Sequence, residues 1–209
     1  LHLPFETGRW QREQPPAGGS LEEEARVARY RFLDTEGKRH GCRRIAPGHT
    51  LNDQAETVLM RFLRGSGPAG LSGIPPCRED GIIRPLIEID RRQVEAYLAQ
   101  NGLSFVTDSS NLESRHLRNR IRLELLPVLE GYQPKIIEHL GRMAGIMRDD
   151  ESWMAQAATS WTATEAEGDS GKGVRISLPS FDRLPGAMKS RVIRYALNRV
   201  GGTLRKVDA

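Results

Sequence analysis

The residues of this sequence that could do chemistry gather in one run, residues 48–67. His49, Asp53 and Glu56 lie near its start, where a short strand predicted over residues 43–47 gives way to a helix. In α/β proteins, the loops at the carboxyl ends of strands are where ligands bind. An aspartate there could hold Mg²⁺ and a glutamate could hold an ammonium group, so the run predicts a site for a charged ligand.

The helix that carries these acids also has a purely structural explanation. Its acids lie in the first turn and its arginines in the last turn, as the helix dipole favours. Helical spacing alone therefore predicts a capped amphipathic helix with a ladder of surface ion pairs, whereas the strand-to-helix position and the glycine run at residues 65–70 favour a binding site. The stripe expected to be buried comprises Ala55, Val58, Leu59, Phe62 and Leu63.

Periodicity and capping patterns predict an α/β first part, residues 1–130, and a mainly helical second part, residues 131–209. Asn52 is expected to cap the helix of the acidic run, and Asp90 to cap a later helix. Another helix should run from about residue 113 and stop before Pro127. The remaining predicted elements are helices over residues 21–34 and 185–200, a long helix from near residue 134, a loop over 163–173 and a strand over 174–178.

Composition narrows the class of protein. The 209 residues are 38% hydrophobic, which suits one large or two small domains, and no window approaches the roughly 18 consecutive apolar residues of a membrane span. Two cysteines, Cys42 and Cys77, exclude a disulfide-built scaffold and fit a reducing, cytoplasmic compartment. The net charge of +4, with 26 arginines and five lysines, favours anionic partners, although a GC-rich genome explains the arginine excess equally well.

The run at residues 48–67, Gly-His-Thr-Leu-Asn-Asp-Gln-Ala-Glu-Thr-Val-Leu-Met-Arg-Phe-Leu-Arg-Gly-Ser-Gly, resembles a motif of the tRNA(Ile)-lysidine synthetases, which are ATP-dependent enzymes of the PP-loop (N-type ATP pyrophosphatase) family. The resemblance covers residues 1–130 and implies an α/β fold. The first part would be a partial PP-loop domain, adenine nucleotide alpha hydrolase-like with a Rossmann-type parallel sheet, and a mainly helical domain would follow. Further segments that resemble the family in the same order are residues 25–31, 84–86, 108–111 and 118–122.

The resemblance implies a carbon–nitrogen ligase of tRNA modification. In that family, ATP activates C2 of the wobble cytidine of an isoleucine tRNA with a CAU anticodon, forming an adenylate and releasing pyrophosphate. The ε-amino group of free L-lysine then displaces AMP to give lysidine. ATP, Mg²⁺, tRNA(Ile) and L-lysine are therefore the implied cofactors and partners, with no membrane involved, and a homodimer is compatible with this function.

The same resemblance implies roles for individual residues. Asp53 is the candidate for Mg²⁺ or for the lysine pocket, Glu56 is the candidate to hold lysine, and His49 is placed to contact phosphate or the adenylate. These three assignments are interchangeable at this level. Arg64 and the backbone from Gly65 would line the nucleotide pocket.

The helix expected over residues 113–126 carries a basic face. One explanation is a solvated face beside a packed one, and the other is contact with tRNA phosphates or with the target base. The residues that share this face, at spacings of three and four, are Arg115, Arg118, Asn119 and Arg122.

One part of the family pattern does not occur here. The phosphate-binding Ser-Gly-Gly-x-Asp-Ser loop is absent from this sequence, so we expect a piece of the enzyme that lacks the N-terminal ATP loop and does not hydrolyse ATP by itself. Two other functions stay open. One is another PP-loop enzyme such as a tRNA thiolase, for which Cys42 and Cys77 do not offer the expected pairing. The other, for this chain by itself, is a non-catalytic tRNA-binding module.

Overall fold

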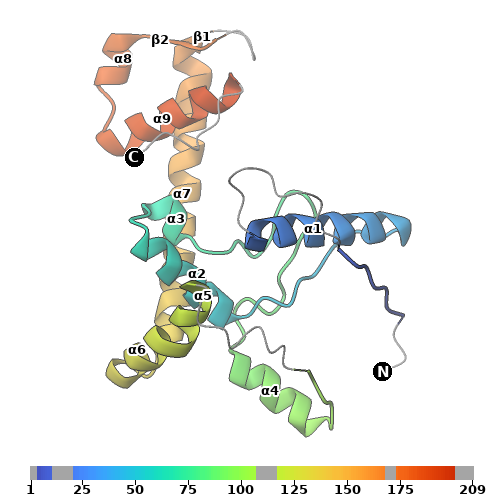
Figure 1. Ribbon diagram of the computed structural model, residues 1–209. Coiled ribbons are helices and arrows are strands. Elements are labelled where there is room, and N and C mark those ends of the chain that lie inside the picture. The colour runs from blue at the N-terminus through green and yellow to red at the C-terminus, as the bar shows by residue number, and fades with distance from the viewer. Residues whose placement is uncertain (1–3, 11–20, 107–116, 168–172, 201–209) are drawn as a thin grey trace.

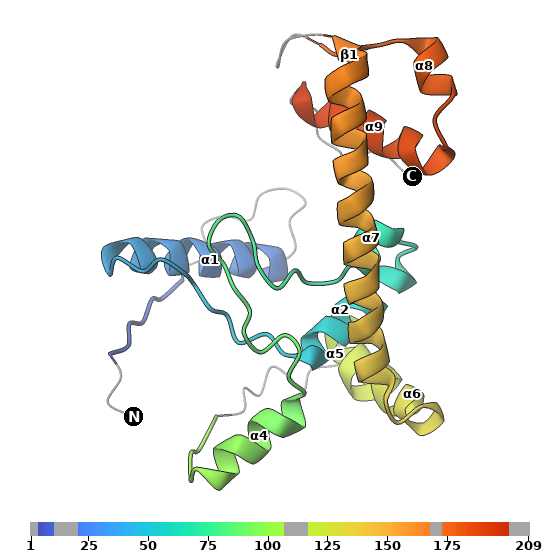
Figure 2. The ribbon, with the colours of Figure 1, turned by 180° about the vertical axis from the view of Figure 1, so that it is seen from behind.

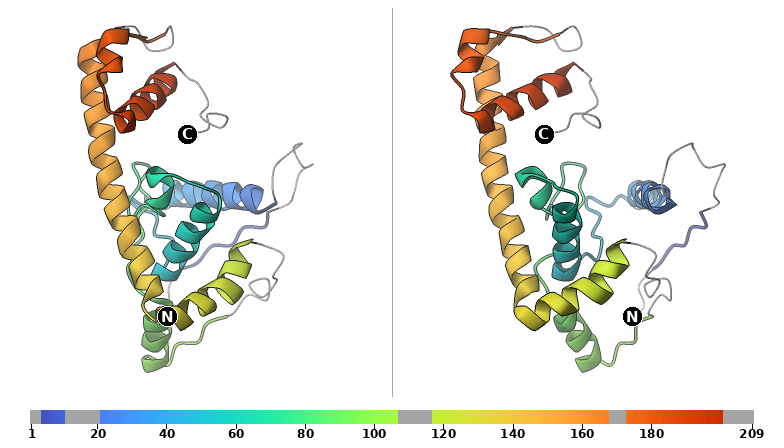
Figure 3. Two further views of the ribbon diagram at one scale, coloured as in Figure 1. Left: turned by 90° about the vertical axis from the view of Figure 1, so that its left-hand side faces the viewer. Right: turned by 60° about the vertical axis from the view of Figure 1, so that its left-hand side comes forward.

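A computed structural model describes residues 4–10, 21–106, 117–167 and 173–200 of the chain. The long helix α7 (Ile136–Glu165) runs vertically through the view of Figure 1 and along one side of the molecule in the views of Figure 3. Helices α2 (Leu51–Leu63) and α3 (Pro68–Leu71) pack against one part of α7, and α9 (Gly186–Arg199) packs against its other end. The long helix expected from near residue 134 and the helix expected over 185–200 are confirmed.

Helix α1 (Leu21–Arg39) lies to one side of α7 in both the front and the back view (Figure 2). It runs five residues beyond the predicted end at residue 34. The strand expected over residues 43–47 is reduced to one parallel bridge, in which Ile83 N donates to Ile45 O at 2.9 Å and Ile45 N donates to Gly81 O at 3.2 Å. Among the described residues, parallel pairing of strands is limited to this bridge.

The first turn of α2 is capped by Thr50 and not by Asn52, so the sequence prediction of its cap is wrong by two residues. Thr50 has the extended backbone that a cap needs, with φ −109° and ψ 177°, and its N–H donates to Asp53 Oδ2 at 2.8 Å. Asn52 serves the neighbouring helix α4 (Arg91–Gln100), because its Oδ1 accepts from Arg91 N at 2.8 Å.

The predicted cap of α4 is confirmed. Asp90 Oδ1 accepts from Arg92 N at 2.7 Å, and Gln93 Oε1 accepts from Asp90 N at 2.9 Å. These two reciprocal bonds are the capping box that the sequence predicts.

The helix expected to stop before Pro127 does not stop there. A short α5 (Leu117–Arg120) leads into a π-helical turn, η2 (Ile121–Leu125), and then into α6 (Leu126–Tyr132). The π-helical turn changes the hydrogen-bond pattern, so Pro127 falls in the first turn of α6, where a backbone N–H is not needed. The predicted residues before Leu117 lie outside the described part of the chain.

The main core lies between α2, the η2–α6 segment and α7. Its buried members are Ala55, Val58 and Leu59 from α2, together with Ile121, Leu126, Ile137, Leu140 and Ala144. Phe62 and Leu63, expected in the buried stripe, are instead 64% and 55% exposed. These two side chains lie on the part of the last turn that points away from the core, so the apolar pattern of α2 is wider than the face that packs.

The remaining elements lie beyond the far end of α7. Helix α7 continues through Glu165, so it enters the segment predicted as a loop over 163–173, and residues 168–172 of that loop lie outside the description. Strand β1 (Ala166–Glu167) pairs antiparallel with β2 (Arg175–Ile176), while Leu178, predicted as part of a strand, begins α8 (Leu178–Asp182). Within the described ranges, no helix is both long and apolar enough to cross a membrane.

Candidate active site

The first two turns of α2 hold the acids in place. Asp53 Oδ2 accepts from the backbone N–H of Thr50 at 2.8 Å and from its hydroxyl at 3.0 Å, which orients this carboxylate toward the start of the helix. Glu56 follows three residues later and is 1% exposed. A carboxylate removed from water to this degree needs charged partners.

Two arginines from the α5–η2 segment provide those partners. Arg118 bridges the acids, with Nη2 2.7 Å from Asp53 Oδ1 and Nε 2.7 Å from Glu56 Oε2. Arg122 binds Glu56 side-on, with Nε 2.6 Å from Oε1 and Nη2 3.0 Å from Oε2. The two arginines therefore donate to three of the four carboxylate oxygens, and Thr50 donates to the fourth, Asp53 Oδ2. We call Asp53, Glu56, Arg118 and Arg122 the carboxylate–arginine cluster.

The cluster corrects two structural expectations from the sequence. The acids of α2 pair with arginines more than 60 positions away and not with Arg61 of their own helix or with Arg64 just after it, so the expected ladder of surface ion pairs along the helix is wrong. The basic face is not simply solvated either, since the Arg118 and Arg122 side chains are only 27% and 23% exposed. Asn119, on the same face, is buried. Arg115, the fourth predicted member, lies outside the described residues.

The surroundings of the site favour the charged form of Arg122 and the neutral form of His49. The hydrogen bond to Glu56 raises the pKa of Arg122 above its ordinary value, against the opposing effect of burial. Burial lowers the pKa of His49, Asp53 partly offsets this, and the positive charges of Arg84 and Arg118 lower it further. His49 Nδ1 is also buried with no hydrogen-bond partner among the described residues. A neutral imidazole with a free ring nitrogen beside the cluster is suited to a polar ligand atom.

The other predicted site residues lie at the opposite end of α2. Arg64 and Gly65 follow the last turn of the helix, about 16 Å from Asp53 at the helical rise per residue. Gly65 has φ +74° and starts a segment, residues 65–74, that we call the glycine loop. The structure thus brings His49, Asp53 and Glu56 together with the arginines but does not bring Arg64 and Gly65 to the same place.

Sequence reasoning did not assign a site role to Arg84, which is 4% exposed and acts on the pKa of His49. Its Nη1 donates to Pro75 O at 2.5 Å, and its Nε is buried with no partner in the described part of the chain. A role for Arg84 could have been predicted from the sequence, because this residue begins the Arg-Pro-Leu segment that resembles the family. The cap by Thr50 was also detectable, because Thr and Asp stand three residues apart as in a capping box.

Mg²⁺ does not fit Asp53 in this arrangement. Its Oδ1 accepts from Arg118 and its Oδ2 accepts twice from Thr50, so both oxygens already have hydrogen-bond partners. Two guanidinium charges also balance the two carboxylate charges, which removes the negative field that a cation needs.

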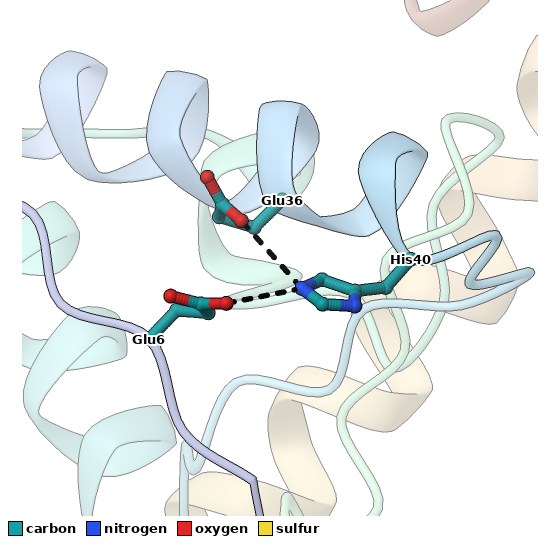
Figure 4. A group of neighbouring side chains, drawn as sticks. All are labelled: Glu6, Glu36 and His40. Carbon is teal, nitrogen blue, oxygen red and sulfur yellow. Dashed lines mark ion pairs between the residues drawn. The ribbon is translucent and has the colours of Figure 1, made fainter.

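A second group of acids lies at the end of α1, away from the cluster (Figure 4). His40 Nε2 is 3.4 Å from Glu6 Oε1 and 3.7 Å from Glu36 Oε2, a donor set that could hold a metal ion. Arg39 Nη1 also lies 3.1 Å from Glu36 and 3.5 Å from Glu6. Because this guanidinium already neutralises the carboxylates, we interpret the group as a surface ion-pair cluster.

Comparison with known proteins matches the sequence to one family. A family model for the PP-loop domain matches residues 1–129. The tRNA(Ile)-lysidine synthase of Solibacter usitatus is 40% identical over 94% of this chain and 45% of the relative, and that of Symbiobacterium thermophilum is 40% identical over 88% and 40%. The synthase of Clostridioides difficile is 38% identical over 91% and 42%. The chain thus spans less than half the length of these relatives.

One solved structure has a similar fold. It is the U34-tRNA thiolase NcsA from Methanococcus maripaludis with its [4Fe-4S] cluster, which superposes with a TM-score of 0.50 at 19% identity over 62% of this chain and 45% of that chain. At this identity the likeness concerns the fold alone. Together with the PP-loop match, it confirms the predicted adenine nucleotide alpha hydrolase-like fold with added helices.

Proposed function

This chain belongs to the PP-loop family of ATP-binding domains, and we propose that the protein containing it joins L-lysine to the wobble cytidine of tRNA(Ile). The relatives named tRNA(Ile)-lysidine synthase support tRNA modification as the general activity. They also confirm the resemblance found in the sequence. Lysine, the CAU anticodon, a cytoplasmic location and a homodimer belong to the proposal.

The proposed reaction has two balanced steps. The C2 oxygen of the cytidine attacks the α-phosphorus of ATP, and pyrophosphate leaves. The ε-amino group of lysine then attacks C2, AMP leaves with that oxygen, and the amine loses a proton. The protein must neutralise phosphate charge and hold an amine against one carbon, and both demands are met by prearranged charged groups.

The single observation that carries the proposal is the carboxylate–arginine cluster. Glu56 is buried behind Arg118 and Arg122, whereas the arginines and Asp53 retain 22–27% of their side-chain exposure. A ligand that arrives from solvent therefore meets the guanidinium groups and Asp53 first. We assign Arg118 and Arg122 to phosphate groups of ATP or tRNA, and Glu56 to positioning both arginines.

The remaining assignments follow from exposure and charge. Asp53 is assigned, like Glu56, to holding Arg118 in place, because its paired oxygens suit an ammonium group no better than they suit Mg²⁺. Neutral His49 is proposed to accept or donate a hydrogen bond at the adenylate. The glycine loop from Gly65, together with Arg64, is proposed to lie against the nucleotide. Buried Asn119 is proposed to position the helix and not to contact substrate. We route no step through Mg²⁺, because Asp53 does not fit the ion as arranged.

The test is a modification assay on the whole protein that contains this chain. It is incubated with ATP, radiolabelled lysine and a tRNA(Ile) transcript with a CAU anticodon, and label in the tRNA is counted. We expect ATP-dependent incorporation, with one AMP released per lysine, and none into a transcript whose wobble base is uridine. In a parallel reaction that contains a labelled inorganic sulfide donor in place of lysine, transfer of sulfur to the tRNA with no lysine incorporation in the first reaction would support the thiolase alternative. Absence of both would contradict the proposal.

The cluster is tested within the same assay. Glu56→Gln keeps the shape of the side chain and removes its charge, so we expect incorporation to fall at least tenfold. The matched control is Glu124→Gln, because Glu124 is 56% exposed on the neighbouring turn and, among the described residues, its ion-pair partner is Arg120 at 3.6 Å. Equal activity of the two variants would contradict the role of the cluster.

A further inference from the structure

The glycine loop folds back along α2 and is held there by two side chains of that helix. Gln54 is 3% exposed and pairs with the backbone of Ile74, accepting from its N–H at 2.6 Å and donating to its O at 3.2 Å. Arg61, two turns further along, donates from Nη1 to Gly70 O at 2.8 Å and to Gly73 O at 2.9 Å. The end of the loop therefore returns to the turn of α2 that carries the acids.

A third anchor comes from the long helix α7. Arg148 Nη2 donates to Ser72 O at 3.0 Å and to Ile74 O at 3.1 Å. Ile74 O thus accepts from Gln54 and from Arg148 at the same time. One nitrogen of Arg148 therefore binds two carbonyl oxygens near the end of the loop, 76 and 74 positions away in the sequence.

Arg148 adds a polar attachment beside the place where the loop already packs on α7. Helix α3, inside the glycine loop, packs against α7, but next to it lies a cleft of about 340 Å³ lined by Arg148, Ser72, Gly73 and small apolar residues such as Ala155. At this cleft the contact between the later part of the loop and α7 is made by hydrogen bonds. Within the described residues, the recorded side-chain hydrogen bonds from α7 to the loop are the two that Arg148 makes.

We propose that Arg148 is a positioning residue for the glycine loop, which makes helix α7 part of the machinery that shapes the nucleotide site. This rests on the proposed function, in which the loop lies against ATP. Helix α7 lies within the segment predicted as a separate helical domain, so Arg148 ties the two parts of the chain together at the loop. Losing a charged hydrogen-bond donor to two carbonyl oxygens lets the loop open more often.

The first experiment measures the loop directly and does not depend on the reaction. Amide hydrogen exchange is followed in the whole protein for Arg148→Met and for Arg142→Met, a control at an exposed position of the same helix. We expect exchange within residues 65–74 to rise about tenfold in Arg148→Met alone, while α2 and α7 keep their protection. Faster exchange spread over α2 and α7, or equal effects of both substitutions, would overturn the positioning role.

The second experiment measures the consequence for ATP. Arg148→Met should raise the KM for ATP about tenfold and leave the KM for lysine within twofold, whereas Arg142→Met changes neither. Arg148→Lys should restore part of the loss, because both hydrogen bonds come from one nitrogen that an ammonium group can replace.

The two experiments separate the parts of this proposal. Faster exchange of the loop with an unchanged KM for ATP would show that Arg148 holds the loop, but it would overturn the claim that the loop shapes the nucleotide site. A protein with no ATP-dependent activity would contradict the proposed function, and the exchange result would stand by itself.

Discussion

Arg122 holds both carboxylate oxygens of Glu56, with Nε 2.6 Å from Oε1 and Nη2 3.0 Å from Oε2. The acid is 1% exposed, so the pair joins the first turns of α2 to the π-helical turn in a place that water hardly reaches. Side-on pairs of this kind fix direction as well as distance. Glu56 therefore determines where the guanidinium groups point, and this gives it a structural and a functional role together.

Removing the charge of Glu56 should cost stability. Glu56→Gln leaves two arginines without their main counter-charge, and because both are partly exposed and can regain water, we expect the free energy of unfolding to fall by about 2 kcal/mol. Urea unfolding of the whole protein measures this. The control Glu124→Gln, an exposed residue, should stay within about 0.5 kcal/mol of the unchanged protein. A fall of the same size in both variants would show that the cluster is not the cause.

Replacing Arg118 should lower stability and lysine incorporation together. A basic face used only for tRNA would predict lost incorporation at an unchanged melting temperature, whereas Arg118 also bridges Asp53 and Glu56. We expect Arg118→Met to cost about 1–3 kcal/mol and Arg120→Met, 60% exposed on the same turn, to cost little. Thermal melting is measured beside the modification assay. An unchanged melting temperature in Arg118→Met would favour the tRNA-only explanation.

His49 should make stability depend on pH. Burial lowers its pKa in the folded protein below the ordinary 6.5, so on acidification the unfolded chain takes up the proton first. Unfolding then gains protons, and the free energy of unfolding falls as the pH drops through about 6.5 toward the folded pKa. We expect the protein to lose more stability between about pH 7.5 and pH 5.5 than His49→Gln does. Parallel losses in urea unfolding would show that other groups account for the acid sensitivity.

Gly73 should tolerate no side chain. Its φ is +64°, and a Cβ atom there would lie 2.6 Å from Gln54 Oε1. Gly73→Ala therefore combines backbone strain with a clash that pushes Gln54 away from Ile74, at an expected cost of about 2–4 kcal/mol. Gly102→Ala isolates the backbone part, because Gly102 has φ +62° with open space around it and should cost about 1 kcal/mol. Equal costs in urea unfolding would mean that Gln54 moves aside freely.

The sequence predicted correctly those helices whose ends and faces are set by residues a few positions apart. The capping box at Asp90, the long helix α7 and the position of α9 were all predictable, because caps and helical periodicity depend on neighbours in the sequence. The errors arose where a second element intervenes. Asn52 accepts from the first backbone N–H of α4 and does not cap its own helix. Pro127 follows a π-helical turn, and Phe62 lies outside the face of α2 that packs in the core.

For the site, the sequence by itself determined which residues share a helix face and which family their order resembles. His49, Asp53 and Glu56 were found because they lie within eight residues of one another. Only the tertiary structure decided that Arg118 and Arg122 meet those acids and that Arg148 meets the glycine loop. The reason is physical: hydrogen bonds and ion pairs act over a few ångströms, and which distant groups come that close depends on how the whole chain packs its apolar surface.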